Sequence, residues 1–427
     1  MEQEVILSVK DLNVKFSLRG QVLHAIRGIS LDIYKGESLA IVGESGSGKS
    51  VFTKNFIGLL DKNGWVDSGE IWYNGMDLAK FKTEKEWTKI RGKEVAMVMQ
   101  DPMTSLNPLK TIGWQIEEAL KLHQGLTGEA AKQRAIEIIS DVGIPEPERR
   151  YKQYPHEFSG GMRQRVVIAI AMACNPKILI CDEPTTALDV TIQAQILNLI
   201  RELQQKYQLT TIYITHDLGV VANVADRIAV MYAGDIVEIG TCNEVFYSPQ
   251  HPYTWALLSS LPQLGVKGQD LYSIKGTPPN LFNKVRGDAF APRNPQALKI
   301  DFLHRPPYFE VSPTHKAHSR RHLRQPRQSS GSMLGLPLEC CSVLPAREPQ
   351  PMPMFLIAPP KPVASCPLKW VRLMNTSASI TARPIFASFT YSPPTTGTAM
   401  SSVPLSPSPM MTGQPTVSGV KPFSQAQ

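Results

Sequence analysis

One eight-residue stretch, residues 43–50, constrains the fold of this 427-residue chain more than any other feature. It fits the pattern Gly-x-x-x-x-Gly-Lys-Ser, in which glycines let backbone N–H groups point at phosphate oxygens. The apolar run 38–42 before it predicts a buried strand, and residues 51–57 after it can continue as a helix. Strand, glycine-rich loop and helix in this order predict a phosphate-binding loop rather than an ordinary glycine turn.

The loop residues have separable chemical roles. Lys49 would reach the β- and γ-phosphates of a nucleotide, and the Ser50 hydroxyl would bind Mg²⁺. The backbone around the glycines would supply the other phosphate contacts. The residues expected to contact the nucleotide here are Gly43, Glu44, Ser45, Gly46, Ser47, Gly48, Lys49, Ser50 and Val51.

A second apolar run, 178–181, ends in two carboxylates, Asp182 and Glu183. A strand with an aspartate at its C-terminal end, downstream of a phosphate loop, is the expected Mg²⁺-binding element. Glu183 can act as general base for water only if it lies where the strand ends, because adjacent strand residues point to opposite faces. The following Pro184 favours such an ending. The alternative is a solvated acidic turn.

Two further polar residues, Gln100 and His216, also follow predicted strands, at 95–99 and 210–215. Because the carboxyl ends of strands in such sheets meet at one edge, we expect both side chains near Glu183. An amide at this position is suited to reach a metal or an attacking water. The alternative for Gln100 is a strand-terminal turn residue.

Two signals are weaker when taken alone. Phe16 lies on a strand predicted over 5–16, where an aromatic ring can either stack on a purine or belong to the core, and the pattern does not choose between them. The triplet 159–161, Ser-Gly-Gly, opens a helix predicted to run to about residue 174. A helix N-terminus of this composition is a second potential anion site.

The whole charge imbalance belongs to the last quarter of the chain. The net charge is +8, and residues 318–427 contain ten of the 45 Lys and Arg residues but two of the 37 Asp and Glu residues. The preceding body is therefore electrically balanced, which removes a charge-based argument for nucleic-acid binding. The most apolar run, 166–174, is far too short to span a membrane, and no secretory signal pattern is expected at the N-terminus.

Residues 318–427 also differ in composition from the rest. They hold 18 of the 35 prolines, no aspartate and no apolar periodicity. Such a segment cannot bury enough apolar surface to offset its chain entropy, so we predict a disordered tail. Its abrupt start favours an out-of-frame translation product after a frameshift near residue 317. The alternative is a basic, proline-rich arm for an anionic membrane surface or an SH3-like partner.

In their order along the chain, these motifs resemble the ATP-binding subunit of ABC transporters over roughly residues 4–260. The ordered set is 43–50, Gln100, 158–162, 178–183, 187–189 and His216. The resemblance implies ATP and Mg²⁺ as ligands. It also implies a head-to-tail dimer, in which the phosphate loop of one cassette binds ATP against the Ser-Gly-Gly signature of the other.

The resemblance further implies a role for individual residues. Phe16 would stack on adenine, Gln100 would sense Mg²⁺ and the membrane subunit, and Asp182 would lie beside Mg²⁺ with Ser50. Glu183 resembles the general base and His216 the γ-phosphate contact, with Lys49 completing the catalytic set. Across the dimer seam, the expected residues are Ser159, Gly160, Gly161, Met162 and Asp189. The signature departs from Leu-Ser-Gly-Gly-Gln at Phe158 and Met162 but keeps the hydroxyl and the glycine amides, so activity is expected.

A finer resemblance is to the oligopeptide/dipeptide importer subfamily. It is carried by residues 100–108, 154–165, 251–254, 276–279 and 289–293. Many members place cysteines around the last of these segments and hold an iron–sulfur cluster. Asp288 and Asn294 stand where those cysteines would be expected, so we predict no iron–sulfur cluster here.

The sequence thus predicts an α/β fold. A P-loop (RecA-like) nucleotide-binding core, an antiparallel β subdomain and an α-helical subdomain at about 101–170 would together form a cassette over residues 1–260. A C-terminal oligopeptide-transporter extension would occupy 261–317, and the tail 318–427.

The function that the resemblance implies is that of the ATP-hydrolysing motor subunit of an importer of oligopeptides or dipeptides. Its implied partners are a second ATP-binding subunit, for which the subfamily favours a paralogue, two transmembrane permease subunits and, indirectly, an extracellular substrate-binding protein. It would be a peripheral subunit at the cytoplasmic face of the membrane. The alternatives are an importer for another substrate, such as a nickel complex, and a soluble ABC ATPase acting on nucleic acid. The single phosphate loop and the lack of sustained heptads argue against the latter.

Overall fold

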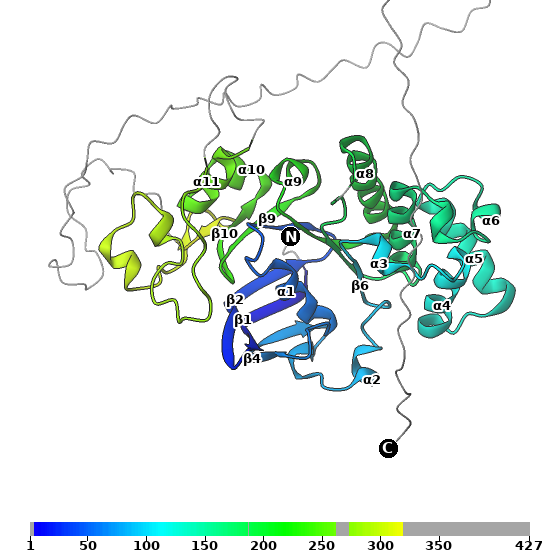
Figure 1. Ribbon diagram of the computed structural model, residues 1–427, viewed down its shortest axis with the longest axis horizontal. Coiled ribbons are helices and arrows are strands. Elements are labelled where there is room, and N and C mark those ends of the chain that lie inside the picture. Colours follow the sequence, from blue (N-terminus) through cyan, green and yellow to red (C-terminus); the bar gives the residue numbers. More distant parts are fainter. Residues whose placement is uncertain (1–3, 187, 262–272, 319–427) are drawn as a thin grey trace, which may run out of the picture. The chain divides into compact units, whose positions relative to one another are not determined.

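The structure is a computed structural model that describes residues 4–186, 188–261 and 273–318 (Figure 1). The strands are β1 (Val5–Leu18), β2 (Gln21–Tyr34), β3 (Ser38–Val42), β4 (Gly64–Tyr73), β5 (Met76–Asp77), β6 (Val95–Val98), β7 (Ile178–Asp182), β8 (Thr210–Thr215), β9 (Arg227–Tyr232), β10 (Asp235–Thr241), β11 (Phe309–Glu310) and β12 (Lys316–Ala317). The α-helices are α1 (Lys49–Lys54), α2 (Glu84–Trp87), α3 (Pro102–Ser105), α4 (Ile112–Gln124), α5 (Gly128–Asp141), α6 (Pro147–Arg150), α7 (Gly160–Met172), α8 (Val190–Tyr207), α9 (Leu218–Val224), α10 (Cys242–Tyr247) and α11 (Pro252–Ser259). The 3₁₀ helices are η1 (Asn55–Ile57), η2 (Leu78–Lys80), η3 (Pro155–Glu157), η5 (Ala291–Arg293) and η6 (Lys299–Phe302).

An eight-stranded sheet with the order β11-β12-β10-β9-β3-β8-β7-β6 forms the centre of the fold. Strands β9, β3, β8, β7 and β6 run parallel, and β10, β12 and β11 are added antiparallel at one edge. Every residue of β3, β7 and β8 is buried, as continuous apolar runs in a parallel sheet require. The predicted α/β core is therefore confirmed, and the phosphate loop follows one of its central strands.

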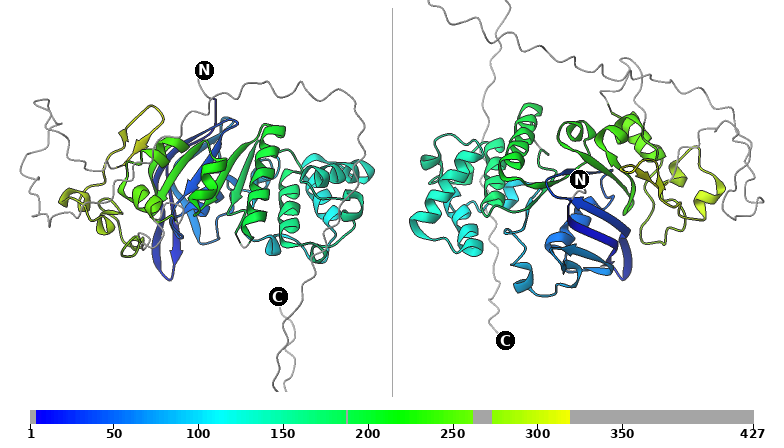
Figure 2. Two further views of the ribbon diagram at one scale, coloured as in Figure 1. Left: turned by 90° about the horizontal axis from the view of Figure 1, so that it is seen from above. Right: turned by 180° about the vertical axis from the view of Figure 1, so that it is seen from behind.

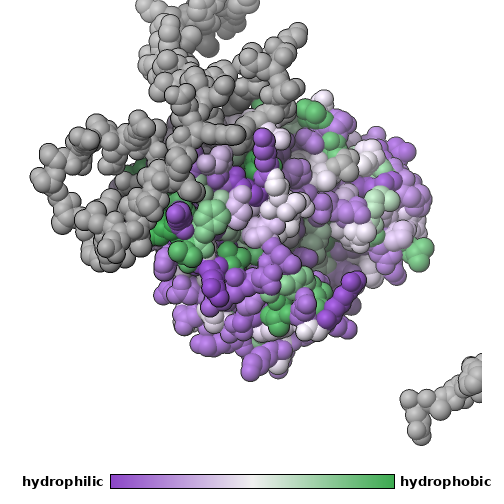
Figure 3. All heavy atoms as spheres, turned by 60° about the vertical axis from the view of Figure 1, so that its left-hand side comes forward, coloured by the Kyte–Doolittle hydropathy of each residue, from purple (hydrophilic) through white to green (hydrophobic). Residues whose placement is uncertain are grey.

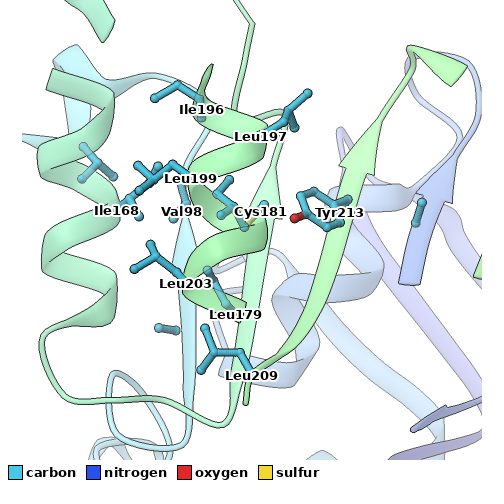
Figure 4. Packing of buried hydrophobic residues seen from close by; sticks show 14 of the residues in the cluster. Val98, Ile168, Leu179, Cys181, Ile196, Leu197, Leu199, Leu203, Leu209 and Tyr213 are labelled. Carbon is cyan, nitrogen blue, oxygen red and sulfur yellow. The ribbon is translucent and has the colours of Figure 1, made fainter. Parts of the chain in front are cut away.

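Helices α7 and α8 pack beside the carboxylate-bearing strand. Along α8 the buried residues recur at helical spacing: Ile196, Leu197, Leu199, Ile200 and Leu203. They join Leu179 and Cys181 of β7 and Ile168 of α7 in one cluster (Figure 4). This packing fixes the C-terminal end of β7, where Asp182 and Glu183 lie, against a rigid layer.

A second, antiparallel sheet has the order β2-β1-β4-β5 and matches the predicted antiparallel subdomain. The residues of β1 alternate between the core and the surface, and those that face the core are Leu7, Val9, Leu12, Val14 and Phe16. A register shift between Val9 and Leu12 keeps both residues on the buried face. Phe52 of α1 and Phe56 of η1 belong to the same apolar cluster, which ties this sheet to the helix after the phosphate loop.

Helices α3 to α7 gather beside the β6 edge of the large sheet (Figures 1 and 2). Helix α4 begins after Thr111, whose hydroxyl accepts a hydrogen bond from the Trp114 N–H. Helices α4 and α5 each bury one apolar face, and the apolar residues on these faces are Ile112, Ile116 and Leu120 in α4 and Ala131, Ala135, Ile138 and Ile139 in α5, whereas Leu122 is exposed. This group carries the Ser-Gly-Gly triplet at the start of α7.

The C-terminal part extends the opposite edge of the large sheet. Strand β12 pairs with β10 through Ala317 and Glu238, and β11 pairs with β12. The C-terminal part also contacts the antiparallel sheet, because the His24 N–H of β2 donates to the Leu281 carbonyl at 3.0 Å. The segment 273–318 is therefore part of the same packed body as the phosphate loop.

The tail was expected to begin at residue 318, but the structure still describes residue 318 as part of the fold. His318 is buried, and its N–H donates to the Val237 carbonyl at 2.9 Å, so the ordered region passes the expected boundary at residue 317. The expected disorder and frameshift otherwise concern residues 319–427, which lie outside the described residues. In the ranges that the structure describes, no helix has the length and apolar character to cross a membrane. The face in Figure 3 carries mainly polar residues, with hydrophobic ones in smaller groups.

Candidate active site

The phosphate loop connects β3 to α1, as the sequence predicts. Gly43 has a φ of +155°, and a Cβ there would lie 2.1 Å from the Met231 carbonyl oxygen. Gly48 has a φ of +103° and would meet the Ala25 carbonyl at 3.1 Å. The contact at Gly43 excludes a side chain, and at Gly48 the positive φ adds strain to a tight contact, so glycine is favoured at both positions.

The loop already positions its lysine. The Lys49 ammonium donates to the carbonyls of Gly43 and Glu44 at 2.8 and 3.0 Å, and burial lowers the pKa of this side chain. The Ser47 hydroxyl is buried and, among the described residues, has no hydrogen-bond partner. A buried ammonium and an unpaired hydroxyl at a helix N-terminus fit a phosphate group, which would supply the missing acceptor.

Two oxygen ligands meet beside the loop. The Ser50 hydroxyl donates to an oxygen of Asp182 at 2.9 Å, and Asp182 is the last residue of β7. Burial raises the pKa of the Asp182 carboxyl, and the adjacent Glu183 charge raises it further, although the bond from Ser50 opposes both. A hydroxyl and a carboxylate in contact fit a divalent cation such as Mg²⁺, which prefers oxygen ligands.

Glu183 lies at the point where β7 ends, as the general-base hypothesis requires. Its φ of +46° turns the chain out of the strand, so Asp182 and Glu183 do not simply alternate across the sheet. One carboxylate oxygen accepts from the Gln100 amide at 2.9 Å and the Thr186 hydroxyl at 3.0 Å. The other lies 3.1 Å from His216 Nδ1. The structure thus brings Gln100, Glu183 and His216 together.

The signature residues form a separate cluster. The Ser159 hydroxyl caps α7 by accepting from the Met162 N–H, and the Asp189 carboxylate caps α8 by accepting from the Ile192 N–H. A Cβ on Gly161 would lie 2.7 Å from a methyl carbon of Ile192, so the two helix starts touch. Within the described ranges, no hydrogen bond or ion pair joins this cluster to the chain's own phosphate loop.

Phe16 is not in an open position. Its side chain is 7% exposed and belongs to the core cluster, and it covers Gly64, where a Cβ would lie 2.5 Å from the ring. This is the core placement that the alternating pattern allowed. Adenine stacking by Phe16 remains a prediction, and it would require the ring to leave this contact.

Sequence reasoning missed the residues that hold the phosphate loop from outside. The Glu44 N–H donates to the Tyr253 hydroxyl at 2.8 Å, and the Glu44 carboxylate accepts from Arg293 at 2.8 Å. Both partners lie in segments, 251–254 and 289–293, that carried the subfamily resemblance without a role. At the positions expected for cluster cysteines, Asp288 accepts from the Phe290 N–H and Asn294 from the Gln296 N–H.

Comparisons with known proteins agree with this geometry. The ABC transporter family matches residues 26–186, and the oligopeptide/dipeptide transporter C-terminal region matches residues 237–300. The oligopeptide transport ATP-binding protein AmiE of Streptococcus pneumoniae is 59% identical over 316 residues, which cover 74% of this chain and 89% of AmiE. The oligopeptide transport ATP-binding protein OppD of Bacillus subtilis is 58% identical over 312 residues, covering 73% and 87% of the two chains.

Solved structures point the same way. A dimeric ATP-binding cassette in a post-hydrolysis state, bound to ADP and Pi, superposes with a TM-score of 0.50 at 28% identity, covering 55% of this chain and 98% of the cassette. The chain belongs to the ABC transporter ATPases, in the group of oligopeptide and dipeptide transport ATP-binding proteins.

Proposed function

We propose that this chain is the ATP-hydrolysing motor subunit of an importer that takes up oligopeptides or dipeptides. The observation that carries the proposal is the convergence of the phosphate loop, the Ser50–Asp182 pair and Glu183 at one sheet edge. The cargo assignment is supported by the relatives, which are named for oligopeptide and dipeptide transport. An importer of another substrate, such as a nickel complex, is the alternative.

In the proposed reaction, Lys49 would bind the β- and γ-phosphates, and Ser50, Asp182 and Gln100 would hold Mg²⁺. When bound, Mg²⁺ neutralises charge on the phosphate oxygens. Glu183 accepts a proton from the water that attacks the γ-phosphorus, and the bond to the β-phosphate oxygen breaks. His216 holds Glu183 through one carboxylate oxygen, and it would also contact the γ-phosphate.

The signature cluster serves the partner's nucleotide in this proposal. Its residues, Ser159, Gly160, Gly161, Met162 and Asp189, make no described contact with the chain's own phosphate loop. A head-to-tail dimer with a second cassette, for which we propose a paralogue, would place them over the other ATP. The dimeric cassette among the structural relatives supports such an arrangement.

The remaining partners follow from the same assignment. We propose two transmembrane permease subunits, an extracellular substrate-binding protein that acts indirectly, and a peripheral position at the cytoplasmic face. A groove of about 690 Å³ next to Gln100 and Asp182, lined also by Met99 and Thr104, supports contact with a permease. The substitutions at Asp288 and Asn294 support the absence of an iron–sulfur cluster, and the balanced charge of residues 1–317 does not favour nucleic acid.

The test compares ATP turnover by the full chain with that of Glu183→Gln. The amide can keep the contacts with Gln100, Thr186 and His216, because its oxygen accepts from the first two and its nitrogen donates to Nδ1. We expect turnover to fall by about 10²–10⁴-fold, the range for losing a general base, while ATP binding persists.

Glu118→Gln, an exposed change on α4, is the matched control and should retain full turnover. Sizing in ATP then reports whether this chain can pair with itself. A Glu183→Gln homodimer would accumulate because ATP is not consumed, and it would overturn the proposed paralogue, whereas a monomer that binds ATP supports a different subunit as the partner. Turnover by Glu183→Gln within tenfold of wild type would refute the proposed base. A wild-type chain that fails to bind ATP would refute the proposed function itself.

A further inference from the structure

The second residue of the phosphate loop, Glu44, is held by two residues of the C-terminal region. Its N–H donates to the Tyr253 hydroxyl of α11 at 2.8 Å. Its carboxylate accepts from Arg293 of η5, also at 2.8 Å. These partners are 209 and 249 residues away along the chain, so the contacts join the loop to a distant part of the sequence.

The two supporting side chains are buried, unlike those of a surface ion pair, and the Glu44 side chain is 25% exposed. The Arg293 side chain is 6% exposed, and its other N–H groups donate to the carbonyls of Ile274 and Lys275 at 3.3 and 3.1 Å. The Tyr253 ring is fully buried and lies 4.5 Å from the Tyr232 ring, centroid to centroid. Because both side chains are fixed by packing and hydrogen bonds, they can hold Glu44 in one position at little further entropic cost.

Glu44 passes this constraint to the phosphate-binding lysine. The Glu44 carbonyl accepts from the Lys49 ammonium at 3.0 Å. The N–H of Glu44 is therefore fixed by Tyr253, its carboxylate by Arg293 and its carbonyl by Lys49. A rotation of the Glu44 peptide, once Tyr253 or Arg293 is lost, would move one of the two carbonyls that place the ammonium.

We propose that Tyr253 and Arg293 are positioning residues for ATP, through which the C-terminal region fixes Glu44 and thereby Lys49. The inference rests on the proposed role of this loop in ATP binding. It assigns the segments 251–254 and 289–293 a part in the ATPase site, although neither contacts the expected nucleotide position directly.

The test measures the Kd of a fluorescent ATP analogue and the Tm of the full chain. Tyr253→Phe keeps the ring and removes one hydroxyl, so we expect a Kd about 3- to 10-fold higher, the effect of one lost hydrogen bond, with Tm nearly unchanged. Glu44→Gln and Arg293→Met should each raise the Kd in the same way. Their combination should raise it no further than either one alone, because both changes break the same contact.

Arg91→Met is the matched control. Arg91 also combines an ion pair, with Glu84 at 2.6 Å, and donation to two carbonyls, those of Ile57 and Gly58, but it does not contact the phosphate loop. It should lower Tm without changing the Kd. The inference is overturned if Tyr253→Phe and Arg293→Met leave the Kd within twofold of wild type. Lys49→Ala distinguishes failure of this inference from failure of the proposed function. If Lys49→Ala binds the analogue as well as the wild type does, the proposed function itself is wrong.

Discussion

Glu238 of β10 offers a stringent test of how the C-terminal region is anchored. Its carboxylate is fully buried. One oxygen accepts from the Gln250 N–H at 2.7 Å and from His315 Nε2 at 2.7 Å, and the other accepts from the His251 N–H at 2.9 Å. Three donors from the α10–α11 connection and the segment before β12 therefore converge on one carboxylate.

Replacement of Glu238 by glutamine removes one of the two acceptor oxygens. A glutamine offers one acceptor oxygen, and its amide nitrogen would face an N–H in either orientation. If the oxygen serves Gln250 and His315, the His251 N–H is left buried and unpaired, at a cost of about 1–3 kcal/mol. The two surviving bonds lose the charged acceptor, which costs about another 1–2 kcal/mol in total.

We therefore expect Glu238→Gln to destabilise the protein by about 2–5 kcal/mol, or roughly 4–10 °C in Tm for a body of this size. Thermal unfolding followed by circular dichroism at pH 7 measures this loss. Glu118→Gln, an exposed change of the same chemistry, should move Tm by less than about 1 °C. A Tm for Glu238→Gln within about 1 °C of wild type would show that the three-donor argument is wrong.

Two further predictions concern pH and packing. Burial lowers the pKa of His251 to about 4, so the folded state holds it neutral, and stability should be lost as pH falls from about 6.5 towards 4. His251→Asn keeps an acceptor for the Tyr253 N–H. It should make the Tm difference between pH 7 and pH 5 smaller than in the wild type. An unchanged difference would exclude His251 as the source of the pH dependence. Gly161→Ala would place a Cβ 2.7 Å from a methyl carbon of Ile192 and should cost about 1–3 kcal/mol of stability, whereas Gly160→Ala meets nothing closer than 3.7 Å. Equal Tm values for these two variants would contradict the packing described for α7 and α8.

Most of the core and the polar edge of the site could be predicted from the sequence, because those features are local. The strand, loop and helix at residues 38–57 were predictable from neighbouring residues in the sequence. The turn at Glu183 was predictable too, because Asp182 and Glu183 can both face the nucleotide only if the strand ends there. The convergence of Gln100 and His216 on Glu183 followed from a single rule on parallel sheets.

Other features depend on contacts that no local pattern encodes. Glu44 meets Tyr253 and Arg293 across more than 200 residues, and the short helices that carry them, α11 and η5, lack distinct polar and apolar faces that would indicate the direction of these side chains. Phe16 shows a different limit. The alternating pattern placed it on a strand, but only the packing against Gly64 decides that the ring is covered.

The short strand β12 has a consequence for the solubility of the fold. Without it, the outer edge of β10 would present unpaired backbone groups, which are a template for pairing with another chain. Residues 316–318 act as a protective edge: Lys316 and Ala317 occupy the ladder, and His318 binds the Val237 carbonyl beyond it. A shortened version of this protein that ends before residue 318 would therefore remove part of its guard against edge-to-edge aggregation.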